Sequence, residues 1–253
     1  MPTIIRQNLF ETNSSSTHTL VVSRYEGNGI RENPVKIKFP FEMYSFGREN
    51  SGTVWTDAPH KLAYVWQMLC SQIDFPTTNL TEEELESDTI PAKITERFNK
   101  FKLLMELVSN SIKNSTNIVI DLSDLEIFKG DENNFYLGSV KDSLVECPWM
   151  DPSIDSAFRI SGTAKIINTM LDSTLAPNIY EINQNTGNPQ LTFDGHCLVE
   201  FFFSLLNFAF SEKSVIISHG ECSDEQEREC EKLIVEYVAR NKGYCYIADT
   251  EAH

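Results

Sequence analysis

The chain has 253 residues, 41% of them hydrophobic and 23% charged, which is enough apolar material for one large domain with a buried core. This composition excludes disorder of the whole chain. The longest apolar run, 197–210, is interrupted by Glu200, Ser204 and Asn207, so we expect no membrane span. The N-terminus lacks the apolar segment of a signal peptide, and the six cysteines contain no Cys-x-x-Cys pair, which together predict a cytoplasmic protein with free thiols.

The formal net charge of −16 is unevenly distributed. Residues 1–50 hold six Arg or Lys and five Asp or Glu, a balance of +1, so the other 203 residues carry −17. An acidic field of this size repels nucleic acid and membrane surfaces, and we therefore expect no direct binding of either. A basic protein partner is compatible with the charge, although an excess of carboxylates also serves solubility alone.

The N-terminal half is predicted to begin with strands and to continue with helices. The strands are expected at 3–9, 19–23 and 35–39, and the longer helices at 60–73 and 92–112. Residues 56–59, Thr-Asp-Ala-Pro, offer a cap for the first of these helices, followed by a proline that is tolerated in a first turn. Thr81 with Glu84 three residues later predicts the capping box of a short acidic helix.

The second half is predicted to alternate helices and strands after an irregular acidic excursion at 124–152. A buried strand is expected at 117–122, before this excursion. After it, helices are expected at 162–171, 197–210 and 224–241. The strands between and after them are expected at 178–182, 190–193, 214–218 and 244–247. Such a succession is typical of a mixed sheet covered by helices. Because no repeat or linker divides the chain, we expect a single α/β or α+β domain over 1–253 with an irregular acidic insertion.

Residues 11–18, Glu-Thr-Asn-Ser-Ser-Ser-Thr-His, are the most unusual stretch of the sequence. Their five hydroxyls, the Asn13 amide and the backbone N–H groups are donors suited to a phosphate or carboxylate ligand. No glycine and no Gly-Lys-Ser/Thr ending is present, so the stretch is not a P-loop. A Ser/Asn-rich connection whose hydroxyls bond backbone groups explains the same residues. The candidate ligand-binding residues are Arg6, Asn13, Ser14, Ser15, Ser16 and Thr17.

The residues of this stretch are also part of a pattern that resembles other proteins. The pattern of Arg6 and 10–18, followed by Phe46-Gly47 and by 61–64, resembles a set of functionally uncharacterised proteins of bacteriophages and some Firmicutes. It covers about the first quarter of the chain, and Arg48 departs from the acidic or aromatic continuation of that set. The resemblance implies a phage or mobile-element setting, and hence the cytoplasm of a host cell. It brings no established activity, so no residue role follows from it.

A second candidate stretch, His-Gly-Glu-Cys-Ser at 219–223, lies between a predicted strand and a predicted helix. Ligands of α/β sheets bind at such strand ends, and a helix N-terminus favours an anion. Cys222 could act as a nucleophile with His219 as its base, and His18 is the third candidate catalytic residue. The neighbouring carboxylates disfavour a thiolate, and a helix-capping loop explains the stretch equally well. The His and Cys spacings match no zinc pattern, so we predict no metal site. The sequence leaves open whether a cofactor is bound.

Two hypotheses about function follow from these residues. In the first, the chain binds or processes a small phosphorylated or nucleotide-like ligand in a pocket lined by residues 11–18. His219 and Cys222 could close that pocket only if their strand is a neighbour of the strand after His18. In the second, the chain is a non-enzymatic acidic inhibitor or binding protein, in one form a nucleic-acid mimic, that targets a host enzyme or defence protein. The sequence favours neither strongly, and it leaves open whether the chain is an enzyme.

Overall fold

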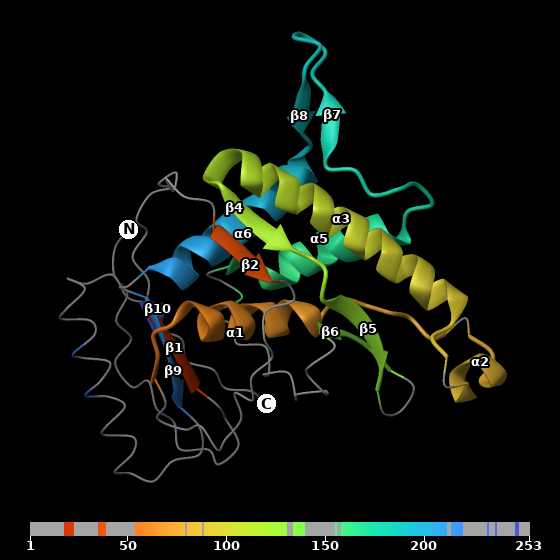
Figure 1. The fold of residues 1–253 in the computed structure, drawn as a ribbon, viewed down its shortest axis with the longest axis horizontal. Coiled ribbons are helices and arrows are strands. Elements are labelled where there is room, and N and C mark those ends of the chain that lie inside the picture. The colour runs from red at the N-terminus through yellow and green to blue at the C-terminus, as the bar shows by residue number, and fades with distance from the viewer. Residues whose placement is uncertain are drawn as a thin grey trace.

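The computed structural model describes residues 18–22, 35–38, 54–78, 80–87, 89–130, 134–139, 155, 158–211, 214–219, 232, 236 and 246–247. Helices and small, mostly antiparallel sheets are mixed along this part of the chain, as Figure 1 shows. The α+β alternative of the predicted fold class is therefore confirmed. The predicted strand at 3–9 lies outside the described residues, as does nearly all of the predicted helix at 224–241.

The core is built by four helices that contact one another: α1 (Ala58–Cys70), α3 (Ala92–Thr116), α5 (Ile160–Asp172) and α6 (Phe193–Phe210). Large aromatic side chains from three of them belong to this core, and the Trp66 and Phe101 ring centroids are 6.4 Å apart. Trp66 of α1, Phe101 of α3 and Phe202 of α6 are at most 1% exposed. All four helices were predicted, α1 and α3 from their apolar periodicity, and burial of such an apolar stripe is the main source of stability of these helices.

The helix ends follow local sequence signals. Asp57 accepts a hydrogen bond from the His60 backbone N–H at 3.1 Å and so caps α1, as predicted. The predicted capping box is present at α2 (Glu82–Glu86), where Thr81 and Glu84 bond each other's backbone N–H groups. Helix α3 runs one turn beyond the predicted Ile112 and ends where Asn117 adopts the left-handed conformation, with φ 64°.

The described strands form four small sheets. The largest has the order β10 (Tyr246–Ile247), β1 (His18–Val22), β9 (Val215–His219), β3 (Val54–Trp55), with antiparallel pairing throughout. The parallel pairing in the described part is that of β2 (Val35–Lys38) with β4 (Ile118–Asp121). The first sheet brings together strands from the two ends of the chain.

A regular hairpin occupies the first half of the segment that we expected to be irregular. Strands β5 (Leu125–Lys129) and β6 (Phe135–Ser139) pair antiparallel. Their alternate residues Leu125, Ile127, Phe135 and Leu137 are buried, and the aromatic residues Phe128 and Tyr136 on the other face obscure this period of two in the sequence. Residues 140–154 of the expected excursion lie outside the described part.

Helix α6 is long and apolar enough to cross a membrane by length and composition alone. Half of it is buried inside the protein, and it contacts α1, α3 and α5. A core helix of a globular protein has both properties, so the absence of a membrane span stays a prediction.

Gly195 in the first turn of α6 permits a close approach to the preceding chain. A Cβ at this position would overlap the carbonyl oxygen of Ile179 and stand 2.8 Å from its Cβ. We therefore expect Gly195→Ala to lower the free energy of unfolding by about 1–3 kcal/mol, measured by urea denaturation. Gly162→Ala in α5 is the matched control, because an added Cβ meets nothing within 4 Å there and removal of a helical glycine favours folding. Equal stability of the two variants would contradict the packing argument.

Candidate functional site

The pairing of β1 with β9 places two candidate residues opposite each other. The two strands are antiparallel over five positions, and the Cα of His18 is the register partner of the Cα of His219. These strands are the two central strands of their sheet. The condition that the sequence left open, that the two strands are neighbours, is therefore met. Residues opposite each other in an antiparallel pair share one face of the sheet.

The β1–β9 ladder changes from apolar to polar along its length. At one end, Val22 is opposite Val215 and Val21 is opposite Ile216, and the two β9 residues are at most 1% exposed. At the other end, Thr19 is opposite Ser218, and the histidine pair follows. The apolar end is thus part of the packed body, whereas the polar end presents hydroxyl-bearing and imidazole-bearing residues on alternate positions.

The described parts of the flanking strands pair with β1 and β9 away from the histidine pair. β10 is in register with Leu20 and Val21, and β3 is in register with Ile216 and Ile217. Among the described strands, none beside β1 or β9 reaches the level of His18 or His219. This end of the ladder is also where the polar segment 11–17 enters β1 and where 220–223 leaves β9. Both candidate stretches therefore attach to the same end of the sheet.

A buried lysine fixes the opposite end of β9. The Nζ of Lys61 in α1 donates to the carbonyl oxygens of Ser211 and Ser214 at 2.9 and 3.0 Å, and to Ser214 Oγ at 2.9 Å. Ser214 directly precedes β9, and the Lys61 side chain is fully buried. Burial lowers the pKa of Lys61 to about 8, partly opposed by the negative charge of Asp57. These bonds attach the start of β9 to the helical core and so help to fix the position of His219 at the other end of the strand.

A histidine that the sequence did not single out has a carboxylate partner. His60 Nδ1 lies 2.7 Å from Asp57 Oδ1, and the His60 ring stacks on Trp55 of β3 with centroids 6.1 Å apart. Burial opposes ionisation of Asp57, but the hydrogen bonds from His60 outweigh it and hold the pKa of this carboxyl below its ordinary value. The Asp-x-x-His spacing was the available signal, and we interpreted it only as a helix cap. The pair orients an imidazole beside the strand next to β9.

Several predicted site residues lie outside the described residues. These are Arg6, Asn13, Ser14, Ser15, Ser16, Thr17 and Cys222. Among the residues that the structure describes, no group of three or more His, Cys, Asp or Glu side chains could hold a metal ion. His196 lies on the surface of α6, where its Nε2 is 3.9 Å from Glu200 Oε2.

Comparison of the chain with protein-family models, with curated proteins and with solved structures finds no match.

Proposed function

We propose that the chain binds or processes a small phosphorylated or nucleotide-like ligand at the His18–His219 end of the β1–β9 ladder. The observation that supports this proposal is the register of the two histidines, which belong to opposite ends of the chain and to both candidate stretches. The polar segment 11–17 supplies hydroxyl, amide and backbone donors for phosphate oxygens. Arg6 adds positive charge in the least acidic part of the chain.

The histidine pair gives the site its chemical capability. An unperturbed imidazole titrates near neutral pH, so it can bind a phosphate as a cation or transfer a proton as a neutral base. When one of two paired histidines is protonated and the other is neutral, the pair provides a cation for a phosphate and a base for proton transfer. In a processing reaction, Cys222, three residues after His219, is the candidate nucleophile.

The proposal is tested by binding of a nucleotide panel to the full chain. The variant carries His18→Asn and His219→Asn, which keep a polar side chain on each strand. Adenosine and guanosine mono-, di- and triphosphates are titrated by calorimetry, with inorganic phosphate as the minimal probe. We expect at least one of these compounds to bind the natural chain, and the double variant to bind it about tenfold or more weakly, since each charge-assisted hydrogen bond contributes about 1.5–3 kcal/mol.

The matched control is His196→Asn, because this histidine has a side chain that is 67% exposed on α6 and belongs to another part of the fold. Its binding should equal that of the natural chain. If no compound in the panel binds, or if the double variant binds as the natural chain does, the ligand-site proposal is lost. The hypothesis of an acidic binding protein would then take its place.

A further inference from the structure

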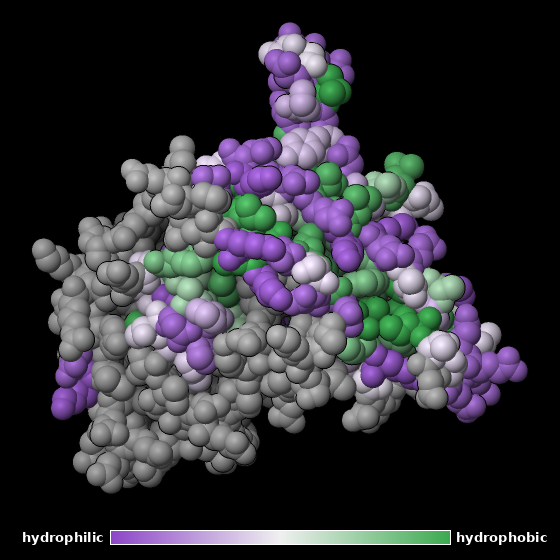
Figure 2. Space-filling model, in the orientation of Figure 1, coloured by the Kyte–Doolittle hydropathy of each residue, from purple (hydrophilic) through white to green (hydrophobic). Residues whose placement is uncertain are grey.

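The hairpin of β7 (Tyr180–Ile182) and β8 (Pro189–Leu191) stands away from the body of the protein. Figure 1 shows it projecting beyond α3 and α6, and Figure 2 shows its tip clear of the rest of the surface. We call residues 178–193 the arm. Because an isolated two-stranded hairpin is only marginally stable in water, a projecting arm needs specific features to hold its shape.

The arm has two chemically different faces. Tyr180 is opposite Leu191 and Ile182 is opposite Pro189, so these four apolar residues share one face. Glu181 is opposite Gln190, and both lie on the other face. Alternation of this kind is typical of a strand with one face buried. Tyr180 and Leu191 of the apolar face are partly buried, because they pack against the core. Ile182 lies beyond the core and is 60% exposed.

The polar face of the arm bonds to itself. Asn183 Nδ2 donates to Gln190 Oε1 at 2.6 Å, and Gln190 Nε2 donates to Glu181 Oε1 at 2.8 Å. At the tip, Asn183 Oδ1 accepts from the backbone N–H groups of Asn185 and Thr186. These bonds stiffen the hairpin and occupy its polar groups, so the apolar face is the surface left for a contact.

Each strand edge of the arm is blocked at one position. The side chain of Asn178 bonds both backbone groups of Tyr180 on β7, with Nδ2 to the carbonyl oxygen at 2.7 Å and Oδ1 to the N–H at 3.1 Å. On β8, Pro189 has no N–H to donate. Edge groups blocked in this way disfavour strand addition. A partner would therefore contact the face of the arm and not extend its sheet.

The base of the arm is anchored rigidly. Ile179 is fully buried, and its carbonyl oxygen accepts from the Thr192 N–H at 2.9 Å. Gly195 packs against the same residue at the start of α6. A rigid support is what a contact surface needs, because little conformational freedom is then lost on binding.

Exposed apolar side chains concentrate around the arm. Five large hydrophobic side chains in the described part are exposed, and the three most exposed lie within 175–193: Leu175 at 75%, Ile182 at 60% and Phe193 at 81%. Scattered exposed side chains are normal, but three within one short segment, one of them on the apolar face of the arm, indicate a contact surface.

The charge around the arm indicates what would cover it. No Lys or Arg occurs between Lys165 and Lys213, whereas Glu181, Asp194 and Glu200 are exposed there. A second copy of this acidic chain is disfavoured by like charge. Two stacked arms would also contribute few side chains to an interface. A specific interface between proteins buries about 800 Å² per partner. A larger partner groove with Lys and Arg at its rim fits both the shape and the charge.

We propose that the arm is a docking element whose apolar face inserts into a groove of another protein, apolar at its floor and basic at its rim. Ile182 and Phe193 are the apolar anchors, and Asp194 and Glu200 pair with the basic rim. This inference is independent of the proposed ligand site, because it uses no residue of that site.

The test places a photo-crosslinking benzoylphenylalanine at position 182 or 193 of the full chain, expressed in the cells from which the gene comes. The matched controls place it at Leu103 or Tyr136, two apolar side chains that are 38% exposed on α3 and β6. We expect a discrete adduct from both arm positions and not from the controls. The protein in that adduct is then purified and titrated with the unlabelled chain.

In that titration, Ile182→Asp should weaken binding at least tenfold, and Leu103→Asp should leave it unchanged. Raising the salt concentration from 50 to 300 mM should also weaken binding, because opposite charges at the rim are screened. An adduct of twice the mass of this chain would assign the arm to self-association and overturn the proposal. Absence of an arm-specific adduct, or indifference of the purified pair to Ile182→Asp and to salt, would overturn it as well.

Discussion

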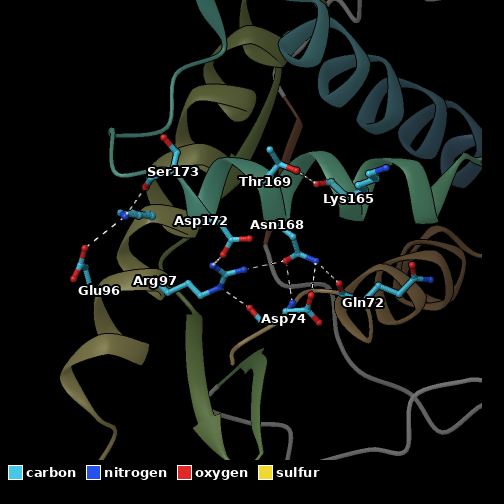
Figure 3. Close-up of polar contacts among 10 residues, drawn as sticks. Gln72, Asp74, Glu96, Arg97, Lys165, Asn168, Thr169, Asp172 and Ser173 are labelled. Carbon is cyan, nitrogen blue, oxygen red and sulfur yellow. Dashed lines mark hydrogen bonds and ion pairs between the residues drawn. The ribbon is translucent and has the colours of Figure 1, made fainter. Parts of the chain in front are cut away.

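Arg97→Ala is expected to lower the free energy of unfolding by about 2–4 kcal/mol, one of the largest single effects that we predict for this chain. Arg97 lies on α3 with a side chain that is only 10% exposed. As Figure 3 shows, its guanidinium joins α3 to two other segments. Nε donates to the Asp74 carbonyl oxygen after α1 at 2.5 Å, and Nη1 and Nη2 donate to Asp172 and Asn168 of α5 at 2.5 and 3.3 Å.

The network around Arg97 determines which of its bonds matters most. Asn168 of α5 also donates to the Gln72 carbonyl oxygen at 2.8 Å, so the turn after α1 is held by two side chains. Removing the arginine leaves the Asp74 carbonyl without this donor at the junction of α1, α3 and α5. The Asp172 side chain is 67% exposed and can be hydrated instead. The bond to the backbone therefore contributes more than the ion pair.

Chemical denaturation of three variants tests this assignment. Asp172→Ala, the matched control, should cost less than about 1 kcal/mol, because exposed ion pairs contribute little. Arg97→Lys should fall between the two, since lysine keeps the charge but not the planar fork. If Asp172→Ala costs as much as Arg97→Ala, the ion pair and not the backbone bond holds the junction.

The helices of this fold were predictable because their signals are local. The Asp57 cap, the Thr81–Glu84 capping box and the periodicity of α3 each depend on residues within a few turns. The extra turn of α3 was missed because its end is set by Asn117 in the left-handed conformation, and sequence alone does not reveal that choice. The β5–β6 hairpin was missed because Phe128 and Tyr136, on the face opposite to its buried residues, break the apolar and polar alternation.

The candidate site was predictable only in its residue types. Polar residues before β1 and a histidine at the end of β9 could be recognised singly, but strand order is a non-local property of the fold. The pairing of His18 with His219 depends on how two distant segments meet. In the same way, the sequence places Arg97 on the buried side of α3 but does not reveal its bonding partners. These are Asp74, in the turn after α1, and Asn168 and Asp172 of α5.

Lys61 should make the folded state more stable as the pH rises from 7 to 10. Its folded pKa is about 8, below the ordinary value of 10.5, because burial disfavours the charged amine. Between these two values the unfolded chain binds more protons than the folded chain, so the free energy of unfolding increases with pH. At 1.36 kcal/mol per pKa unit, the gain is about 2 kcal/mol by pH 10.

The measurement is the difference in free energy of unfolding between the natural chain and Lys61→Met, followed from pH 7 to 10 in urea. Taking the difference cancels the titration of groups that both proteins share. Lys36→Met controls for the loss of a positive charge, because the Lys36 side chain is 68% exposed. A flat difference for Lys61→Met would mean that the buried amine keeps its proton over this range. The three oxygens around Nζ, from Ser211 and Ser214, would then outweigh burial and hold a charged lysine beside the start of β9.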